Sequence, residues 1–261
     1  MLFVVSLLLL CSEVFCLPTD FMCSLMPGKL KQIDAGAGEV YGVDNNDDIY
    51  HLVNDAWKPI PGKLKHVTVG PAGVWGVSAA NQVYRIENGQ CKLVPGSLKQ
   101  VDAGGPRFIA GVNSANGIIC SSKTCPLSDI SWVNLEGGLK YYSCGGLGCW
   151  GVNADNRVYY RSGISPTSCQ GSGWQEIEGR LVMMEVGSDY AVYGVSPDGD
   201  IYRRYGITVS NPAGTGWAKL NLAETYKHVT FDDFYLWLIN MNGEILRCQL
   251  AQCYRDNLAY P

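Results

Sequence analysis

The 261-residue sequence lacks an excess of charge of either sign. Lys and Arg total 20 and Asp and Glu total 24, so the formal net charge is only −4. With neither a polybasic domain nor an acidic tail, the charge pattern does not suggest a nucleic-acid partner. Charged residues make up 17% of the chain against 47% apolar residues, a balance that favours a packed globule over a disordered chain.

Catalytic signatures are also missing. The sequence contains no G-x-S-x-G, H-E-x-x-H or P-loop motif. It has three histidines, and two of them, His66 and His228, occupy the same position of an internal repeat, which favours a structural role over a catalytic one. The sequence therefore does not predict an enzyme.

Long apolar runs occur only at the N-terminus. Residues 1–15 are almost purely apolar and are followed by Cys16, Leu17 and Pro18, a pattern typical of a cleaved secretory signal rather than of a membrane span. The alternative is a buried N-terminal strand. We expect residues 1–16 to be removed, and we expect the mature chain, residues 17–261, to be secreted without a membrane-spanning helix.

The chain is instead rich in glycine and in repeats. It contains 31 Gly, 15 Tyr and 7 Trp, and no long segment has the apolar period of a helix. Pro27–Ile60 reads PGKLKQIDAGAGEVYGVDNNDDIYHLVNDAWKPI, and the next segment, PGKLKHVTVGPAGVWGVSAANQVYRIENGQCKLV, nearly repeats it. Six copies follow one another, at about 27–60, 61–94, 95–135, 136–177, 178–220 and 221–253. Such a repeat identifies the architecture before any local pattern is interpreted.

Each copy contains four short apolar segments separated by turns that are rich in Gly, Asn and Asp. In the first copy we expect strands at 30–35, 40–44, 49–53 and 57–60. A four-stranded antiparallel sheet of this length, repeated radially, is a propeller blade. The predicted fold is all-β, a six-bladed β-propeller.

The ends of the chain indicate how the ring closes. The sixth copy lacks its fourth strand, and residues 23–26 precede the first repeat at the position where other copies have a Trp strand. The N-terminal segment is therefore expected to complete blade six, which removes the open sheet edges. In the first copy, Leu52 is expected to lie opposite Trp57. Cys248 corresponds to Leu52 and Cys23 to Trp57, so we predict a Cys23–Cys248 disulfide.

The remaining cysteines are less constrained. Cleavage of the signal would leave nine, and we predict two local disulfides, Cys120–Cys125 and Cys144–Cys149, each flanking a turn. No partner is predicted for Cys91, Cys169 or Cys253, although Cys253 could replace Cys248, and a spare thiol could join two chains in a homodimer. The nine are scattered over five blades, which argues against a metal site.

The unit LKQIDAG…V(Y/W)GV…IY…W, present six times over about residues 23–253, resembles the tectonin repeat. The resemblance implies a six-bladed propeller that binds N-acetylglucosamine-type glycans and microbial surfaces in innate defence. Two departures stand out. Cys91 replaces the Trp of the second copy, and the sixth copy has LWLIN where the others have a Gly-Val pair.

The loop between the second and third strands is the best candidate for sugar contacts, because sugar hydroxyls need short, fixed amide and carboxylate partners. This loop or the neighbouring inter-blade groove is expected to hold the ligand, and the alternative is that the loops only form turns. In the first copy, residues 44–48 also look like a calcium loop, but the central Gly and terminal Glu are missing, so neither calcium nor another cofactor is predicted. The candidate residues are Asp44, Asn46, Asp47, Ser78, Asn81, Asn113, Asn116, Asn153, Asp155, Asn156 and Asp198.

One repeat position is almost always lysine. In a closed ring these residues would surround one face of an acidic protein, and they are candidates for binding anionic polysaccharide or lipopolysaccharide phosphates. The alternative is a set of solvated lysines at strand ends. The ring comprises Lys31, Lys65, Lys99, Lys140 and Lys227, with Val182 as the exception.

The sequence thus favours a secreted multivalent lectin. A protein-interaction propeller of the WD or Kelch kind is the alternative from another class. The signal, the disulfides and the absence of Trp-Asp dipeptides argue against it.

Overall fold

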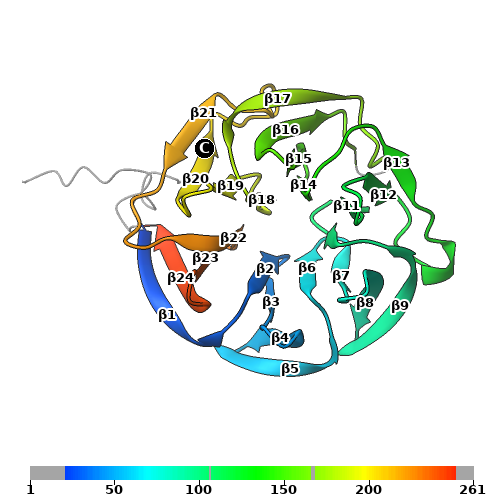
Figure 1. Ribbon diagram of the computed structural model, residues 1–261, viewed down its shortest axis with the longest axis horizontal. Coiled ribbons are helices and arrows are strands. Elements are labelled where there is room, and N and C mark those ends of the chain that lie inside the picture. Colours follow the sequence, from blue (N-terminus) through cyan, green and yellow to red (C-terminus); the bar gives the residue numbers. More distant parts are fainter. Residues whose placement is uncertain (1–20, 106, 166–167, 251–261) are drawn as a thin grey trace, which may run out of the picture.

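Six four-stranded antiparallel sheets surround a central axis in the computed structural model (Figure 1). The structure describes residues 21–250 apart from 106, 166 and 167. The predicted signal segment, residues 1–16, and Cys253 lie outside the described residues. Within those residues, no helix is long and apolar enough to cross a membrane.

The strands follow the repeats. Blade one contains β2 (Gln32–Gly36), β3 (Glu39–Val43), β4 (Asp48–Val53) and β5 (Ala56–Lys63). Blade two contains β6 (His66–Gly70), β7 (Gly73–Val77), β8 (Gln82–Glu87) and β9 (Gln90–Ser97). Blade three contains β10 (Gln100–Asp102), β11 (Ile109–Val112), β12 (Ile118–Ser121) and β13 (Val133–Leu135), with one 3-10 turn, η1 (Leu127–Asp129), before β13.

The second half of the ring is built in the same way. Blade four contains β14 (Tyr141–Gly145), β15 (Gly148–Val152), β16 (Arg157–Ser162) and β17 (Gly173–Arg180). Blade five contains β18 (Met183–Val186), β19 (Val192–Val195), β20 (Ile201–Tyr205) and β21 (Gly216–Lys219). Blade six contains β22 (Tyr226–Asp232), β23 (Tyr235–Asn240), β24 (Glu244–Leu250) and β1 (Phe21–Lys29).

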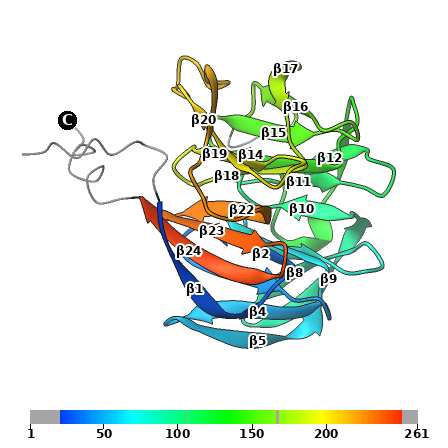
Figure 2. The same cartoon turned by 60° about the vertical axis from the view of Figure 1, so that its left-hand side comes forward.

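The N-terminal strand closes the ring. β1 pairs antiparallel with β24, and Cys23 lies directly opposite Cys248 in that ladder, as Leu52 lies opposite Trp57 in blade one. The Cys23–Cys248 disulfide is present, which confirms both the predicted register and the predicted closure. Figure 2 shows β1 and β24 side by side along the edge of the ring.

The local disulfide predictions have mixed outcomes. Cys144–Cys149 is confirmed. Cys120–Cys125 is wrong, because Cys120 forms a disulfide with Cys169 of blade four. Cys120 is a buried residue of β12 in the apolar cluster between blades three and four, where Cys169 also lies, whereas Cys125 is exposed and has a free thiol. Proximity in the sequence did not predict the partner of Cys120, because the side chain of Cys120 faces the next blade.

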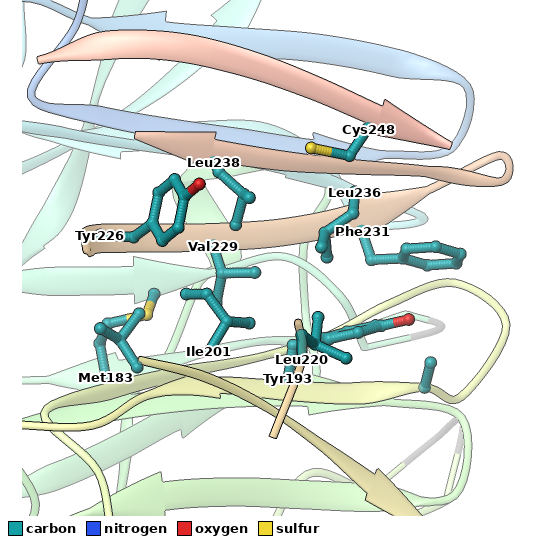
Figure 3. Packing of buried hydrophobic residues seen from close by; sticks show 12 residues of the cluster. Met183, Tyr193, Ile201, Leu220, Tyr226, Val229, Phe231, Leu236, Leu238 and Cys248 are labelled. Carbon is teal, nitrogen blue, oxygen red and sulfur yellow. The ribbon is translucent and has the colours of Figure 1, made fainter. Parts of the chain in front are cut away.

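Apolar residues fill the spaces between neighbouring blades. Figure 3 shows the cluster between blades five and six, in which Val229 and Leu238 of blade six approach Met183 and Ile201 of blade five. Similar clusters join the other blades, so both faces of the central strands are buried. This arrangement explains the consecutive apolar residues of segments such as VYGV and VWGV.

In blades three, four and five, the recurring Trp links its blade to the outer edge of the previous blade. Trp132, Trp174 and Trp217 donate their indole N–H groups to backbone carbonyls at the end of the previous blade, over 2.6, 2.9 and 2.8 Å. The Gly of the preceding PG turn leaves room for the ring. At Gly96, where φ is +141°, a Cβ atom would lie 2.4 Å from Nε1 of Trp132. Both the backbone conformation and the contact therefore require glycine.

Candidate functional site

The turns between the second and third strands of all six blades lie on one side of the ring, which we call the loop face. The first residue of each turn uses its side chain to close the turn. Asp44 Oδ1 accepts the N–H groups of Asn46 and Asp48, at 2.8 and 2.9 Å. Asn113, Asn153 and Asn240 make both contacts, and the hydroxyls of Ser78 and Ser196 accept only the N–H of the residue four positions later. These side chains therefore support the turn whether or not they also contact a ligand.

The last residue of each turn joins the blade to the next one. Its carbonyl accepts the N–H of a residue at or just before the start of the next blade's innermost strand, as between Asp47 and Leu64 at 2.9 Å and between Asn81 and Leu98 at 2.9 Å. The backbone there is left-handed, a conformation that Asn, Asp and Gly tolerate best. The residues concerned are Asp47, Asn81, Asn116, Asn156, Gly199 and Gly243.

The candidate lysines and the candidate Asn and Asp residues of the turns were predicted as separate sets, but the structure brings them into contact. Lys31 forms an ion pair with Asp47 of its own blade. Lys65 donates to Asn81, and the corresponding pairs in blades three and four are Lys99–Asn116 and Lys140–Asn156. Each of these four lysines is thus held over the loop face by the turn of its own blade.

Because three of these partners are neutral amides, they orient the ammonium groups without neutralising them. Burial lowers the pKa of Lys65, Lys99, Lys140 and Lys227, and neighbouring lysines contribute further at Lys65 and Lys99. Such mutual influence requires the ammonium groups to lie near one another. The lysine ring is therefore a concentrated positive feature, except at Lys31, where Asp47 compensates the charge.

Grooves open between blades on the loop face. The groove between blades one and two has a volume of about 370 Å³ and is lined by Asp47, Ser78, Gln82 and Tyr84, together with Ala79 and Ala80. A second groove, of about 560 Å³, lies between blades five and six beside Asp200, Glu224 and Asn240. The first groove combines an aromatic ring with short polar groups. Asn46, Asp155 and Asp198 lie in the turns of the same face but do not line these two grooves.

The axis of the ring is plugged by a layer of buried polar groups. One inner-strand position alternates carboxylate and hydroxyl around the ring, as Asp34, Thr68, Asp102, Ser143, Glu185 and Thr230, each at most 6% exposed. These side chains bond the next blade. Asp34 accepts the N–H of Val69 at 2.7 Å, and Asp102 accepts that of Cys144 at 2.8 Å. Sequence reasoning missed this layer, although the alternation is readable once the repeats are aligned.

Burial controls the ionisation of this layer. It raises the pKa of Asp34 to about 6 and raises the pKa of Asp102 and Glu185 well above the ordinary range. The three carboxyl groups border an axial cavity of about 170 Å³. Even so, the described part of the chain contains no group of three or more His, Cys, Asp or Glu side chains arranged to hold a metal ion.

The two repeat-position histidines belong to the adjacent layer. The phenol of Tyr141 lies between them, 3.2 Å from His66 Nε2 and 3.4 Å from His228 Nε2, and it donates to Glu185. Burial, reinforced by positively charged neighbours, lowers the pKa of both histidines to about 3. They are therefore neutral residues of the interior, far from solvent and without access to a substrate.

The comparison with known families identifies the repeats. The model of the tectonin domain matches residues 29–241. The chain belongs to the tectonin domain family.

A characterised relative covers almost the same length. The chain is 46% identical over 235 residues to the fish-egg lectin of Cyprinus carpio, and the match spans 88% of this chain and 99% of the relative. More distant propellers share the fold alone. They include human WBSCR16, with a TM-score of 0.57 at 10% identity over 85% of this chain and 72% of that chain. Virginiamycin B lyase from Staphylococcus aureus has a TM-score of 0.56 at 16% identity over 82% of this chain and 78% of that chain.

Proposed function

We propose that this protein is a secreted multivalent lectin that binds N-acetylglucosamine-type or microbial surface glycans in innate defence. The observation that carries the proposal is the 46% identity to a fish-egg lectin over 99% of that protein's length. The three disulfides support an extracellular location, because disulfides persist in oxidising compartments. No enzymatic role is proposed, and no cofactor is required.

The inter-blade grooves of the loop face are the proposed sugar sites. In the groove between blades one and two, Tyr84 offers an aromatic ring to the apolar face of a sugar, while Asp47, Ser78 and Gln82 offer acceptors and donors to its hydroxyls. Its volume of about 370 Å³ is in the range of small-molecule sites, which runs from about 300 to 1,000 Å³. Because many turn side chains already hold the backbone, the grooves are better sites than the turns alone.

Multivalency follows from the repeats. Two grooves of the loop face are described, and if each binds a sugar, one molecule engages more than one glycan on a surface at once. Binding to a densely glycosylated surface would then exceed the affinity of a single groove by roughly 10²–10⁴-fold when the geometry allows simultaneous contact. A weak single site is therefore compatible with strong surface binding.

Filling the first groove should remove one site. Ala79 is exposed in the turn that lines the groove, and Ala79→Trp places a large side chain there without removing a turn hydrogen bond. Calorimetric titration with N-acetylglucosamine should show fewer sites per chain than in the natural protein. Leu93→Trp, at an exposed position of β9 in the same blade, lines none of the grooves described and controls for a bulky surface residue. Equal stoichiometry in the natural protein and Ala79→Trp would refute this groove as a site.

The lysine ring supports a second partner, anionic polysaccharide or lipopolysaccharide. The neutral Asn partners leave the charges of Lys99 and Lys140 uncompensated, whereas Asp47 acts on Lys65 through space, and this observation favours the ring over a set of independent surface lysines.

Charge reversal tests this role of the ring. The double variant Lys65→Glu with Lys140→Glu should bind lipopolysaccharide at least tenfold more weakly at low salt, and its binding should depend less on salt concentration, because ring charges attract the phosphates. The double variant Lys58→Glu with Lys123→Glu makes the same charge change at exposed positions outside the ring. If both double variants bind like the natural protein, the ring has no such role.

A protein-interaction scaffold without sugar binding is the alternative class. It would leave every sugar titration flat while the fold remained intact.

A further inference from the structure

A large cavity lies on the opposite side of the ring from the loop face. It has a volume of about 600 Å³ and opens beside blade five, between the β18–β19 hairpin and the long β20–β21 loop, with Leu147 of blade four at its edge. We call it the blade-five cleft. The sequence prediction placed all candidate ligand contacts on the loop face, so this cleft belongs to none of the sites proposed above.

The cleft contains a cation, Arg203, that forms no close ion pair. Arg203 stacks over Tyr193, with its guanidinium carbon 5.8 Å from the ring centroid. Among the residues that the structure describes, no carboxylate oxygen lies within 4.0 Å of this guanidinium, and no hydrogen bond to it is formed.

The same repeat position behaves differently in other blades. Arg85 stacks on Trp75 and pairs with Glu87 at 3.1 Å, and Arg247 stacks on Tyr235 and pairs with Asp55 at 2.6 Å. The strand pairings place Arg85, Arg203 and Arg247 at equivalent points of the third strand, opposite the second-strand aromatic residue or its neighbour. Blade five thus retains the stacked cation and lacks the carboxylate that compensates it elsewhere.

The rest of the cleft suits a sugar. Tyr190 and Tyr205 line it and are 47% and 53% exposed, so each can offer a ring face to a saccharide. Thr208, from the β20–β21 loop, adds a hydroxyl. Asp189 also lines the cleft, and its Oδ1 accepts the N–H of Ala191 at 3.0 Å, which holds the hairpin turn. Burial raises the pKa of this carboxyl group, and the charge of Arg203, which lies beyond ion-pair distance, offsets part of the rise. Apolar walls with a few convergent polar groups are typical of a small-molecule site.

We propose that the blade-five cleft binds a sugar that carries a carboxylate, of the uronic or sialic acid class, with the carboxylate on the guanidinium of Arg203 and the sugar ring against Tyr190 or Tyr205. The inference rests on the proposed lectin function only in taking a saccharide as the ligand. The planar guanidinium matches a carboxylate with two parallel hydrogen bonds, which also supplies the close ion pair that blade five lacks. The ligand thus takes the place that Glu87 and Asp55 have in other blades.

A matched pair of ligands tests the inference on the natural protein. Methyl glucuronide and methyl glucoside differ only at the carboxylate, and titration followed by NMR should give at least tenfold tighter binding of the glucuronide. We expect this preference because hydrogen bonds between a guanidinium and a carboxylate are charge-assisted and therefore stronger than those between neutral groups. Equal binding of the two ligands, or binding of neither, would overturn the inference without depending on any variant.

Two variants locate the effect. Arg203→Gln should reduce glucuronide binding at least tenfold and leave the glucoside unchanged, and Arg203→Lys should fall between because it retains charge without the bidentate geometry. Arg157→Gln makes the same charge change beside the loop-face turn of blade four and should bind like the natural protein. If Arg203→Gln matches Arg157→Gln, the cleft is not the site. Because Arg203→Gln leaves the loop face intact, its titration with N-acetylglucosamine reports separately on the proposed lectin function.

Discussion

Replacing both Cys23 and Cys248 with alanine is expected to destabilise the fold by about 5 kcal/mol, because the disulfide closes a loop with a sequence separation of 225 residues. In the chain-entropy description, a longer closed loop restricts the unfolded chain more. The disulfide also joins β1 to β24, the one pairing in the ring that brings the two ends of the chain together. Loss of the crosslink should therefore act on the whole propeller rather than on one hairpin.

The Cys144–Cys149 disulfide provides the matched comparison. Its sequence separation is only 5 residues, so replacing both cysteines with alanine should cost about 2 kcal/mol in the same description. Guanidinium chloride unfolding without added reductant, so that the disulfides of the natural protein stay intact, would give both values. If the two double variants lose equal stability, closure through the chain ends does not contribute what the topology predicts.

Replacing Asp34 with alanine should destabilise the protein by about 3 kcal/mol at pH 5, because buried groups lose their acceptor. Asp34 accepts the N–H of Val69 in blade two and that of Ala35, and its Oδ1 also accepts the hydroxyl of Thr230 in blade six. One side chain thus joins three blades at the axis. Thr230, Val69 and Ala35 would be left buried and without this partner.

The cost should depend on pH in a defined direction. The pKa of Asp34 is raised from 3.8 to about 6, so this side chain contributes stability that is fully present below pH 4 and is lost as the pH rises through 6. The difference between the natural protein and Asp34→Ala should therefore be about 1 kcal/mol smaller at pH 7 than at pH 5. Asp198→Ala, at an exposed turn position, should change stability by less than about 0.5 kcal/mol at either pH. A cost for Asp34→Ala that grows between pH 5 and pH 7 would contradict this explanation.

The sequence contained nearly all the information about the fold because the repeat supplied six independent readings of one pattern. The predicted strand at 40–44 corresponds to β3 at Glu39–Val43, and the missing fourth strand of blade six is β1, as the alignment of Cys23 with Trp57 required. Register followed from the same alignment. A repeat cannot shift by one residue without moving its apolar residues to the wrong face.

The disulfide between Cys120 and Cys169 could not be predicted in the same way. It joins β12 of blade three to the β16–β17 loop of blade four, and Cys169 belongs to the segment in which blade four differs from blade one. Spacing along the chain favoured Cys125, but the orientation of Cys120 toward blade four decided the pairing. Side-chain direction across a blade interface depends on the packed structure.

The sequence predicted which residues belong to the candidate site, but only the structure showed which of them contact one another. Lysines and Asn/Asp turns were separate sets in the sequence, although the spacing of 16 residues between Lys65 and Asn81 recurs between Lys140 and Asn156. The unpaired Arg203 was not predicted, because its significance depends on which carboxylates lie near it in space. Aligning Arg203 with Arg85 and Arg247 would have shown the repeated cation but not the absent partner.

Binding of the purified natural protein to a panel of immobilised glycans tests the proposed function most directly. We expect retention on N-acetylglucosamine-terminated or microbial surface glycans, with signal that rises steeply with glycan density because several grooves engage one surface. Competition with free N-acetylglucosamine should reduce that signal. A folded protein that binds no amino-sugar or microbial glycan on the panel would contradict the lectin function.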